Sequence, residues 1–223
     1  MNAGDFFNIV KEPSTGVYKD KGSSFLSFIY PILHESAVKS ILFTLKKEHP
    51  KARHICHAYQ WGPDPSYFRI NDDGEPGGTA GNPILNQLKS HKLDNTLLVV
   101  VRYFGGTLLG VPGLINAYKQ SALHVIQHAS IIIMRRNVYF NISASYSMEK
   151  NLLSFLRKND GEIISKKYAE SIEIEASFPI SLHQKIVIQS IHQPNVNRQP
   201  NEGILPGGGL EYLNVRFLQK DDY

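Results

Sequence analysis

Two kinds of hydrophobic periodicity divide the first 134 residues into short strands and amphipathic helices. β-Branched and aromatic side chains surround a Lys-Gly-Ser turn near the start, which predicts a strand pair. Further along, apolar positions three and four residues apart predict helices, one of which follows the helix-starting pair Asn82-Pro83. The expected strands are 17–32 (a pair), 54–61, 96–102 and 131–134, and the expected helices are 35–48, one that starts at Asn82, and 113–128.

The strand at 96–102 has an unbroken apolar run, Leu97 to Val101, which is typical of a central strand covered on both faces.

The rest of the chain has a different order of elements. After residue 137 the order is strand, helix, strand, strand, helix, strand, a βαββαβ pattern that fits a ferredoxin-like sandwich. These elements are expected at 138–145, 148–158, 162–169, 171–178, 181–192 and 211–217, with a loop rich in Pro, Asn and Gly at 193–209. We therefore expect an α+β protein of two domains, 1–136 and 137–223.

Composition and charge limit the classes of protein that remain. The chain has 223 residues, of which 42% are hydrophobic, and a formal net charge of +4. Residues 1–137 contain 15 Lys and Arg against 10 Asp and Glu, an excess of positive charge that suits a polyanion such as RNA, although an excess of this size is also ordinary. A lone cysteine, the absence of a secretion signal at the start and the absence of a long apolar run lead us to expect a cytoplasmic protein with no membrane partner.

The loop at 71–81 is acidic and rich in glycine. Three carboxylates within four residues could bind a divalent cation through oxygen, or could supply an acid and a base. The same residue types also form plain turns, and the spacing of a calcium loop is absent. We expect a loop that shapes a ligand site and binds no metal, formed by Asp72, Asp73, Gly74, Glu75 and Thr79.

A second candidate site lies where the apolar strand leads through glycines into a helix. Glycines allow the backbone to approach a ligand closely, and the amides at a helix start suit a phosphate. An arginine at the strand end adds a forked donor, and two aromatic rings could stack on bases. The alternative is a crossing where strand and helix pack closely. The residues concerned are Arg102, Tyr103, Phe104, Gly105, Gly106 and Gly113.

Two further groups of residues precede the acidic loop. His54 and Cys56 face the same side of a strand, where a Cys/His nucleophile pair is conceivable but packed side chains are favoured. One cysteine is also too few for a structural zinc site. Basic residues with aromatic neighbours could bind a single strand of nucleic acid or form a solvated face. These residues are Lys19, Lys21, Lys51 and Arg53 with Tyr18, Tyr59 and Trp61.

Five motifs in a fixed order are more specific than any of them alone. They are Lys21-x-Ser23-x-Phe25, His54-x-Cys56-x-Ala58, Asp72-Asp73-Gly74-Glu75-Pro76-x-Gly78-Thr79-Ala80-Gly81-x-Pro83, Val99-Val100-Val101-Arg102-Tyr103-Phe104-Gly105-Gly106-x-x-Leu109-Gly110 and Gly113-Leu114-x-x-Ala117-Tyr118. Together they closely resemble the IMPACT/YigZ family over residues 21–118. The second domain is similar to the bacterial members in length and element order.

The resemblance implies a fold and a biological setting. It implies that the first domain resembles domain 2 of ribosomal small-subunit protein five, and that the second resembles the ferredoxin-like fifth domain of elongation factor G. Eukaryotic IMPACT regulates translation in a stress-kinase pathway, partly through an extra N-terminal domain. This chain begins directly with the shared domain, so we do not expect the kinase-pathway role to apply to it. No catalytic residues are established for the family, and Ser24 and Asn116 stand where members often have Arg and Lys.

Three hypotheses about function follow. The first is a translation-linked regulatory protein that binds RNA or the ribosome, with a translation-regulatory protein as a further candidate partner, no cofactor and no assigned catalytic residue. Its expected contact residues are Lys21, Ser23, Arg53, His54, Arg102, Tyr103, Phe104, Gly105, Gly106 and Gly113. The second is a hydrolase that depends on a metal or on the His/Cys pair. The third is a protein-interaction module that binds no nucleic acid.

Overall fold

The computed structural model describes residues 3–62, 66–183, 202–203 and 213–218. The chain forms two compact units, each with mixed α/β structure and its own hydrophobic core. The N-terminal unit is Phe7–Met134, and the C-terminal unit combines Met1–Phe6 with Arg135–Tyr223. Among the described residues, no helix is both long enough and apolar enough to cross a bilayer.

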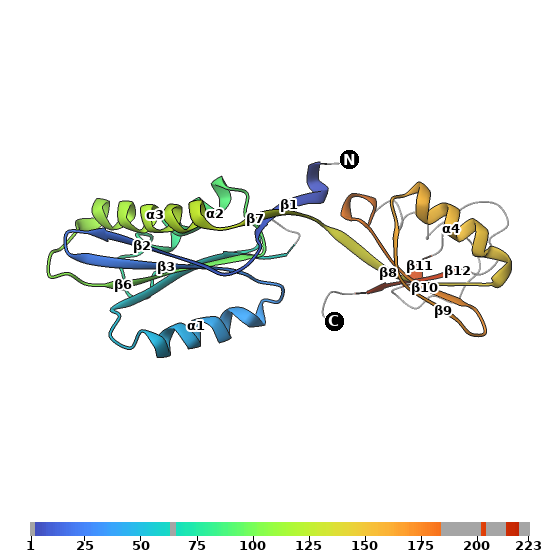
Figure 1. Cartoon of the computed structure of the whole chain (residues 1–223), viewed down its shortest axis with the longest axis horizontal. Helices are drawn as coiled ribbons and strands as arrows, with labels where there is room; N and C mark the ends of the chain where they lie inside the picture. Colours follow the sequence, from blue (N-terminus) through green and yellow to red (C-terminus); the bar gives the residue numbers. More distant parts are fainter. Residues whose placement is uncertain (1–2, 63–65, 184–201, 204–212, 219–223) are drawn as a thin grey trace. The chain divides into compact units, whose positions relative to one another are not determined.

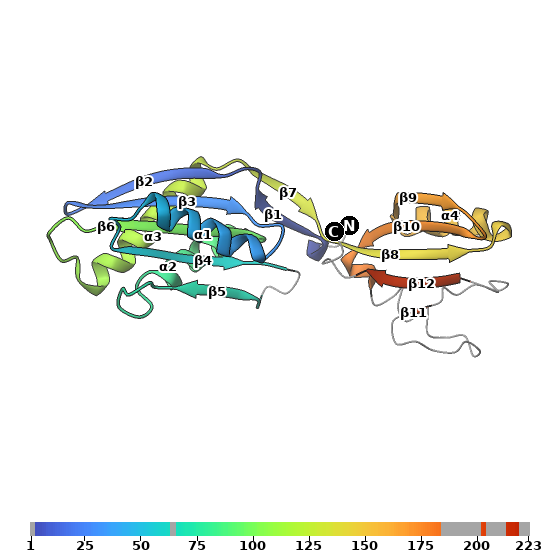
Figure 2. The ribbon, with the colours of Figure 1, turned by 90° about the horizontal axis from the view of Figure 1, so that it is seen from below.

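The N-terminal unit is built on a five-stranded antiparallel sheet. Its strands lie in the order β2-β3-β6-β4-β5, so β6 is central (Figure 2). A separate two-stranded sheet pairs β1 with β7. The bounds are β1 Phe6–Val10, β2 Ser14–Asp20, β3 Ser23–Pro31, α1 Ser36–Glu48, β4 His54–Gln60, β5 Phe68–Asn71, α2 Gly81–Ser90, β6 Thr96–Tyr103, α3 Gly110–His128 and β7 Ile131–Arg135.

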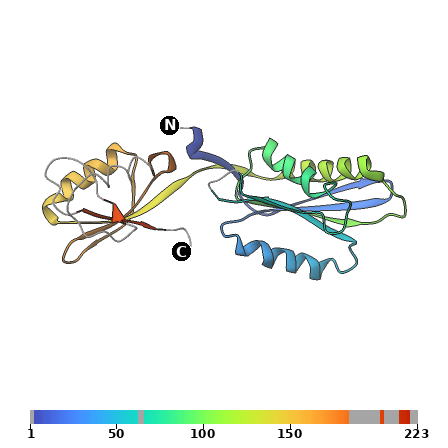
Figure 3. The ribbon, with the colours of Figure 1, turned by 180° about the vertical axis from the view of Figure 1, so that it is seen from behind.

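Helices cover both faces of this sheet. Helix α1 lies on one face, and α2 and α3 lie on the other (Figures 1 and 3). Successive side chains of β6 therefore enter different cores: Leu98 and Val100 pack with α2 and α3, whereas Val99 and Val101 pack on the α1 side. All four are 0% exposed, which confirms the prediction that this strand is covered on both faces.

The C-terminal unit contains a second five-stranded antiparallel sheet with the order β11-β12-β8-β10-β9. Helix α4 packs Leu152 and Leu156 into the core formed by β8 and β10. The bounds are η1 Ala3–Asp5, β8 Asn137–Ala144, η2 Tyr146–Met148, α4 Glu149–Lys158, β9 Glu162–Tyr168, β10 Ile172–Pro179, η3 Ile180–Leu182, β11 Glu202–Gly203 and β12 Leu213–Leu218. Beyond residue 183, the helix expected at 181–192 lies outside the described residues.

The structure differs from the predicted organisation at the N-terminus and at some boundaries. Residues 1–6 cluster with the C-terminal unit because Asp5 accepts hydrogen bonds from the amide and the hydroxyl of Ser181, at 2.9 and 2.8 Å. The amide of Arg136 also donates to the carbonyl of Asp5. Strands β1, β5 and β11 were not predicted, since each is short and β5 follows a Gly-Pro-rich break. Helix α3 starts at Gly110, three residues earlier than expected.

Candidate nucleic-acid interface

Three segments that are distant in sequence meet at one end of the N-terminal sheet. The end of β6 pairs with the start of β3 through Tyr103 and Ser24, and with the start of β4 through Arg102 and His54. The amide of Arg53 donates to the carbonyl of Arg102 at 3.0 Å, which extends the contact beyond β4. The β2–β3 turn, the segment before β4 and the loop after β6 therefore share this end, which we call the loop end.

A close backbone contact fixes the β2–β3 turn against the loop after β6. A Cβ atom added to Gly105 would lie 1.9 Å from the carbonyl carbon of Gly22, so no side chain fits there. The amide of Gly105 donates to the hydroxyl of Ser23 at 3.2 Å, so both groups bond to each other rather than facing a ligand. Lys21, in the left-handed region with φ 43°, is exposed beside this contact.

Exposed cations surround the loop end. Lys21 and Arg53 are both exposed in the segments just described. Further exposed cations lie in the adjoining residues of β2, in the last turn of α1 and between α1 and β4, and they are Lys19, Lys46, Lys47 and Lys51. The loop end therefore has more exposed cations than exposed carboxylates, of which Glu48 lies in the last turn of α1 and Asp73 in the acidic loop.

The aromatic residues expected beside these cations lie elsewhere. Tyr59 and Trp61 are at or beyond the opposite end of β4, and the Tyr59 hydroxyl donates to Glu35 at 2.6 Å. Tyr18 packs against the hydrophobic core of the α2–α3 side. The expected interleaving of Lys19, Lys51 and these rings is not formed, because seven residues of extended strand separate the two ends of β4.

Arg102 is buried and ion-paired, which changes its expected role. It is 5% exposed, and its guanidinium donates to the Glu75 carboxylate at 2.5 Å. The Tyr118 hydroxyl donates to the same carboxylate oxygen at 2.8 Å, and Glu75 is only 8% exposed. Arg102 therefore joins β6 to the acidic loop and α3, and this geometry corrects the expectation that its guanidinium contacts a phosphate.

The remaining ring side chains differ in accessibility. The Nδ1 atom of His54 bonds to the carbonyl of Asp73 at 2.8 Å, and its Nε2 atom lies 3.8 Å from Glu75. Tyr103 faces α1, where its hydroxyl lies 2.9 Å from Nδ1 of His49. Phe104, in contrast, is 46% exposed, so its ring remains available for stacking.

The acidic loop is a structural element of the loop end. The Asp72 carboxylate accepts the amides of Gly78, Ala80 and Gly81 at 2.8 to 2.9 Å, and thereby caps the start of α2 in place of the predicted Asn82. Burial acts to raise the pKa of Asp72, but these three amides keep it below its ordinary value.

Other residues of the loop are fixed in a similar way. Asp73 accepts the amide of Ile55 at 2.7 Å, and Thr79 donates to the carbonyl of Pro76 at 2.7 Å. Gly74 has φ 85°, a backbone conformation that favours glycine at this position. Within the part of the chain that the structure describes, no three His, Cys, Asp or Glu residues are arranged to bind a metal ion.

The start of α3 has no side-chain cap. Leu109 precedes the helix and makes no capping hydrogen bond. Gly113 lies in the first turn, where an added Cβ would approach Leu109 to 3.0 Å. Gly106 has φ 87° and no neighbour near the position of an added Cβ, so the space beside it is open.

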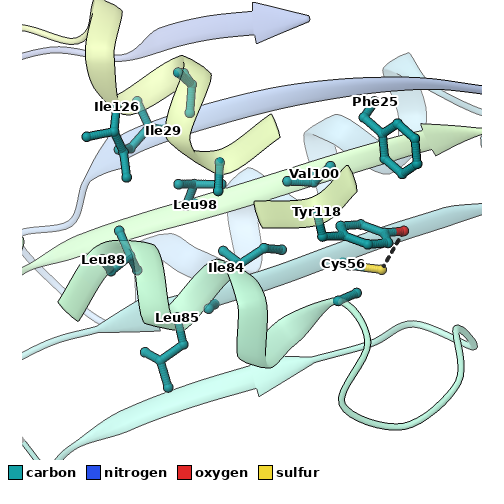
Figure 4. Packing of buried hydrophobic residues seen from close by; sticks show 14 of the residues in the cluster. Phe25, Ile29, Cys56, Ile84, Leu85, Leu88, Leu98, Val100, Tyr118 and Ile126 are labelled. Carbon is teal, nitrogen blue, oxygen red and sulfur yellow. Dashed lines mark hydrogen bonds between the residues drawn. The ribbon is translucent and has the colours of Figure 1, made fainter. Parts of the chain in front are cut away.

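Cys56 is a buried thiol that contacts both α3 and the acidic loop. It is 0% exposed, and its Sγ atom lies 3.3 Å from the Tyr118 hydroxyl (Figure 4) and 3.0 Å from the carbonyl of Asp72. Burial raises the pKa of the Cys56 thiol to about 12, and burial also raises the pKa of Tyr118. Sequence analysis placed Tyr118 in a family motif but gave no signal that its hydroxyl joins Cys56 and Glu75.

We expect Cys56 in the native protein to resist alkylation by iodoacetamide at about pH 8, where an exposed thiol reacts readily. Between about pH 8.5 and about pH 12 the unfolded thiol loses its proton while the folded one retains it. Rising pH in this window therefore lowers the stability of the fold, and below it Cys56 contributes no pH dependence. Mass spectrometry measures the rate at which iodoacetamide alkylates Cys56 in the native protein, with urea-unfolded protein as the reactive control. Equal rates in the two states would contradict this account.

Several known proteins are similar to this chain. Residues 21–126, which lie inside the N-terminal unit, match the family model described as the Impact N-terminal domain. The IMPACT family member YvyE of Bacillus subtilis is 34% identical over 166 residues, covering 74% of this chain and 76% of the relative. The IMPACT family member YigZ of Escherichia coli is 32% identical over 169 residues, covering 75% and 83%. A crystal structure described as a hypothetical protein has a TM-score of 0.62 at 28% identity, covering 82% of this chain and 90% of that one.

Proposed function

This chain belongs to the IMPACT family, and from that premise we propose that it is a translation-linked regulatory protein that binds RNA or the ribosome through the loop end. The resemblance to a family with translation regulators supplies the setting. The convergence of exposed cations at the loop end supplies the chemistry, because phosphate backbones are bound chiefly by Lys and Arg.

The observation that carries the proposal is the meeting of the β2–β3 turn with the start of β4 at the end of β6. Register and a backbone hydrogen bond bring Lys21 and Arg53 to the same end, and both are exposed. The sequence has no Asp or Glu between Asp94 and Glu149, so β6, the following loop and α3 bring no carboxylate to this surface. Such a surface attracts a polyanion.

The buried residues position this surface. Glu75 binds Arg102 of β6 and Tyr118 of α3, and Asp72 fixes the start of α2. The ends of these elements therefore have a defined geometry before any ligand binds. In this proposal Arg102 is a positioning residue, and Lys21 and Arg53 are the phosphate contacts.

We expect the double variant Lys21→Gln/Arg53→Gln to bind single-stranded RNA at least about tenfold more weakly than the unchanged protein, because charge-assisted hydrogen bonds to phosphate are lost. Fluorescence anisotropy of labelled RNA in about 100 mM salt measures this loss. The matched control is Lys39→Gln/Lys89→Gln, which removes the same charge from exposed lysines in the first turn of α1 and the last turn of α2.

The control variant separates local contacts from net charge. If both double variants weaken binding equally, the loop end is not the binding surface. If the unchanged protein does not bind RNA even in low salt, RNA binding by this surface is refuted.

A protein partner is the second candidate. Leu108, Val111 and Ile115, at the start of α3, are 83%, 51% and 41% exposed, which is unusual for aliphatic side chains so close together. Affinity capture from lysate with and without ribonuclease discriminates the two candidates, because a complex formed only through RNA is lost after nuclease treatment. The hydrolase hypothesis has less support, since Cys56 is buried and its pKa is raised.

A further inference from the structure

Phe104 is an exposed aromatic side chain of the loop end, and it directly follows the last residue of β6. A phenylalanine ring that is 46% exposed loses part of the stabilisation that burial would give it. Phe104 is the residue directly after β6, so the backbone of the central strand fixes the position of its Cα atom. An exposed ring on a rigid strand end is suited to bind a flat ligand.

The surroundings of Phe104 hold the ring on one side and leave space near it on another. The guanidinium of Arg102 lies over the ring, 5.7 Å from its centroid, and this guanidinium is itself fixed by Glu75. The next two residues are glycines, and an added Cβ at Gly106 would meet nothing within 4 Å. No side chain of these two glycines therefore competes with a ligand for the ring.

An exposed cation lies across the glycine contact from Phe104. Gly105 touches the backbone of Gly22, and Lys21 is the exposed residue directly before it. A ring beside a cation is the combination that single-stranded nucleic acids recognise, because bases stack on the ring while the phosphates meet the positive charge. In a duplex the bases are stacked inside the helix and offer no free face.

We propose that Phe104 is a stacking platform for an unpaired base, so that the loop end selects single-stranded or looped RNA over duplex RNA. This inference rests on the proposed function, and it names the class of RNA and the side chain that recognises it. Lys21 and Arg53 contact phosphates in any RNA, whereas Phe104 contacts only a base that has left its pair.

The test compares three substitutions in the full chain. Phe104→Leu keeps an apolar side chain but removes the flat face, and Phe104→Trp keeps the flat face. Phe43→Leu is the matched control, because Phe43 is 62% exposed and has Lys47 over its ring at 4.4 Å but lies on α1, on the other face of the sheet. The probes are a single-stranded RNA of about 12 nucleotides that carries 2-aminopurine, and a duplex of the same sequence.

We expect Phe104→Leu to bind the single strand about tenfold more weakly than the unchanged protein, and Phe104→Trp and Phe43→Leu to bind it normally. The salt dependence of Phe104→Leu should equal that of the unchanged protein, because no phosphate contact is removed. Stacking should also quench the 2-aminopurine fluorescence, and the duplex should bind at least about tenfold more weakly than the single strand.

The failures of this inference and of the proposed function are distinguishable. If the unchanged protein binds neither probe, the proposed function fails. If it binds RNA with the expected dependence on Lys21 and Arg53, but Phe104→Leu binds as tightly as the unchanged protein or the duplex binds equally well, only the stacking platform is refuted. Thermal unfolding of each variant identifies any loss of fold, and normal binding by Phe104→Trp with weak binding by Phe104→Leu assigns the effect to the flat face.

Discussion

Replacing Glu75 by alanine should lower the free energy of unfolding of the N-terminal unit by about 3–5 kcal/mol, the usual cost of removing one partner of a buried ion pair. The substitution leaves the guanidinium of Arg102, itself 5% exposed, without its carboxylate partner. It also removes the acceptor of the Tyr118 hydroxyl. Because these bonds join the acidic loop, β6 and α3, RNA affinity should fall as well.

Urea unfolding followed by the fluorescence of Trp61 measures this change, since Trp61 is the one tryptophan of the sequence and lies in the N-terminal unit. Glu75→Gln should be less destabilising than Glu75→Ala, because an amide oxygen still accepts hydrogen bonds but the charge of Arg102 is no longer balanced. Glu12→Ala, at an exposed position, is the matched control and should change stability by less than about 0.5 kcal/mol. A Glu75→Ala variant as stable as this control would show that the buried pair does not support the fold.

Gly105→Ala should be the second severe substitution, with a loss of about 3 kcal/mol, at the upper part of the range for overpacking. The added methyl group would lie 1.9 Å from the carbonyl carbon of Gly22 and 2.3 Å from the amide nitrogen of Ser23. Both are backbone atoms, so the conflict is relieved only if the β2–β3 turn separates from the loop after β6. Lys21 then moves away from Phe104, and RNA binding should weaken even where the protein remains folded.

Gly77→Ala is the matched control, because Gly77 is exposed, has no atom within 4 Å of an added Cβ and does not require a positive φ. It should leave both stability and RNA affinity unchanged. The same urea titration and RNA anisotropy apply to both variants. If Gly105→Ala folds and binds RNA like Gly77→Ala, the close contact between the two loops does not organise the surface.

Patterns local in sequence predicted most of the architecture. The unbroken apolar run from Leu97 to Val101 identified the central strand, because only a strand covered on both faces tolerates such a run. Helices α1 and α4 were found within one residue of their bounds, since their apolar positions recur at helical spacing. The strands β1, β5 and β11 were missed because each is too short to give a clear hydrophobic periodicity.

These local patterns did not predict contacts between residues that are far apart in the sequence. Arg102 was expected to face a ligand, but its partner Glu75 lies 27 residues earlier in a loop, and periodicity does not reveal which charges pair. Asn82 had the ordinary composition of a helix cap, yet Asp72 caps α2 from nine residues before Gly81. Lys21 and Arg53 lie at the same end of the sheet, because each adjoins a strand that pairs with the end of β6. Their contact with phosphate stays a prediction.

The salt dependence of RNA binding tests most directly whether the loop end binds a phosphate backbone. Binding constants for single-stranded RNA are measured between about 50 and about 200 mM salt for the unchanged protein, Lys21→Gln/Arg53→Gln and Lys39→Gln/Lys89→Gln. If Lys21 and Arg53 each contact one phosphate, the slope of log K against log salt should fall in magnitude by about 1.4 in the first variant and not in the second. Equal slopes for all three proteins, or no measurable binding at the lowest salt, would contradict the account.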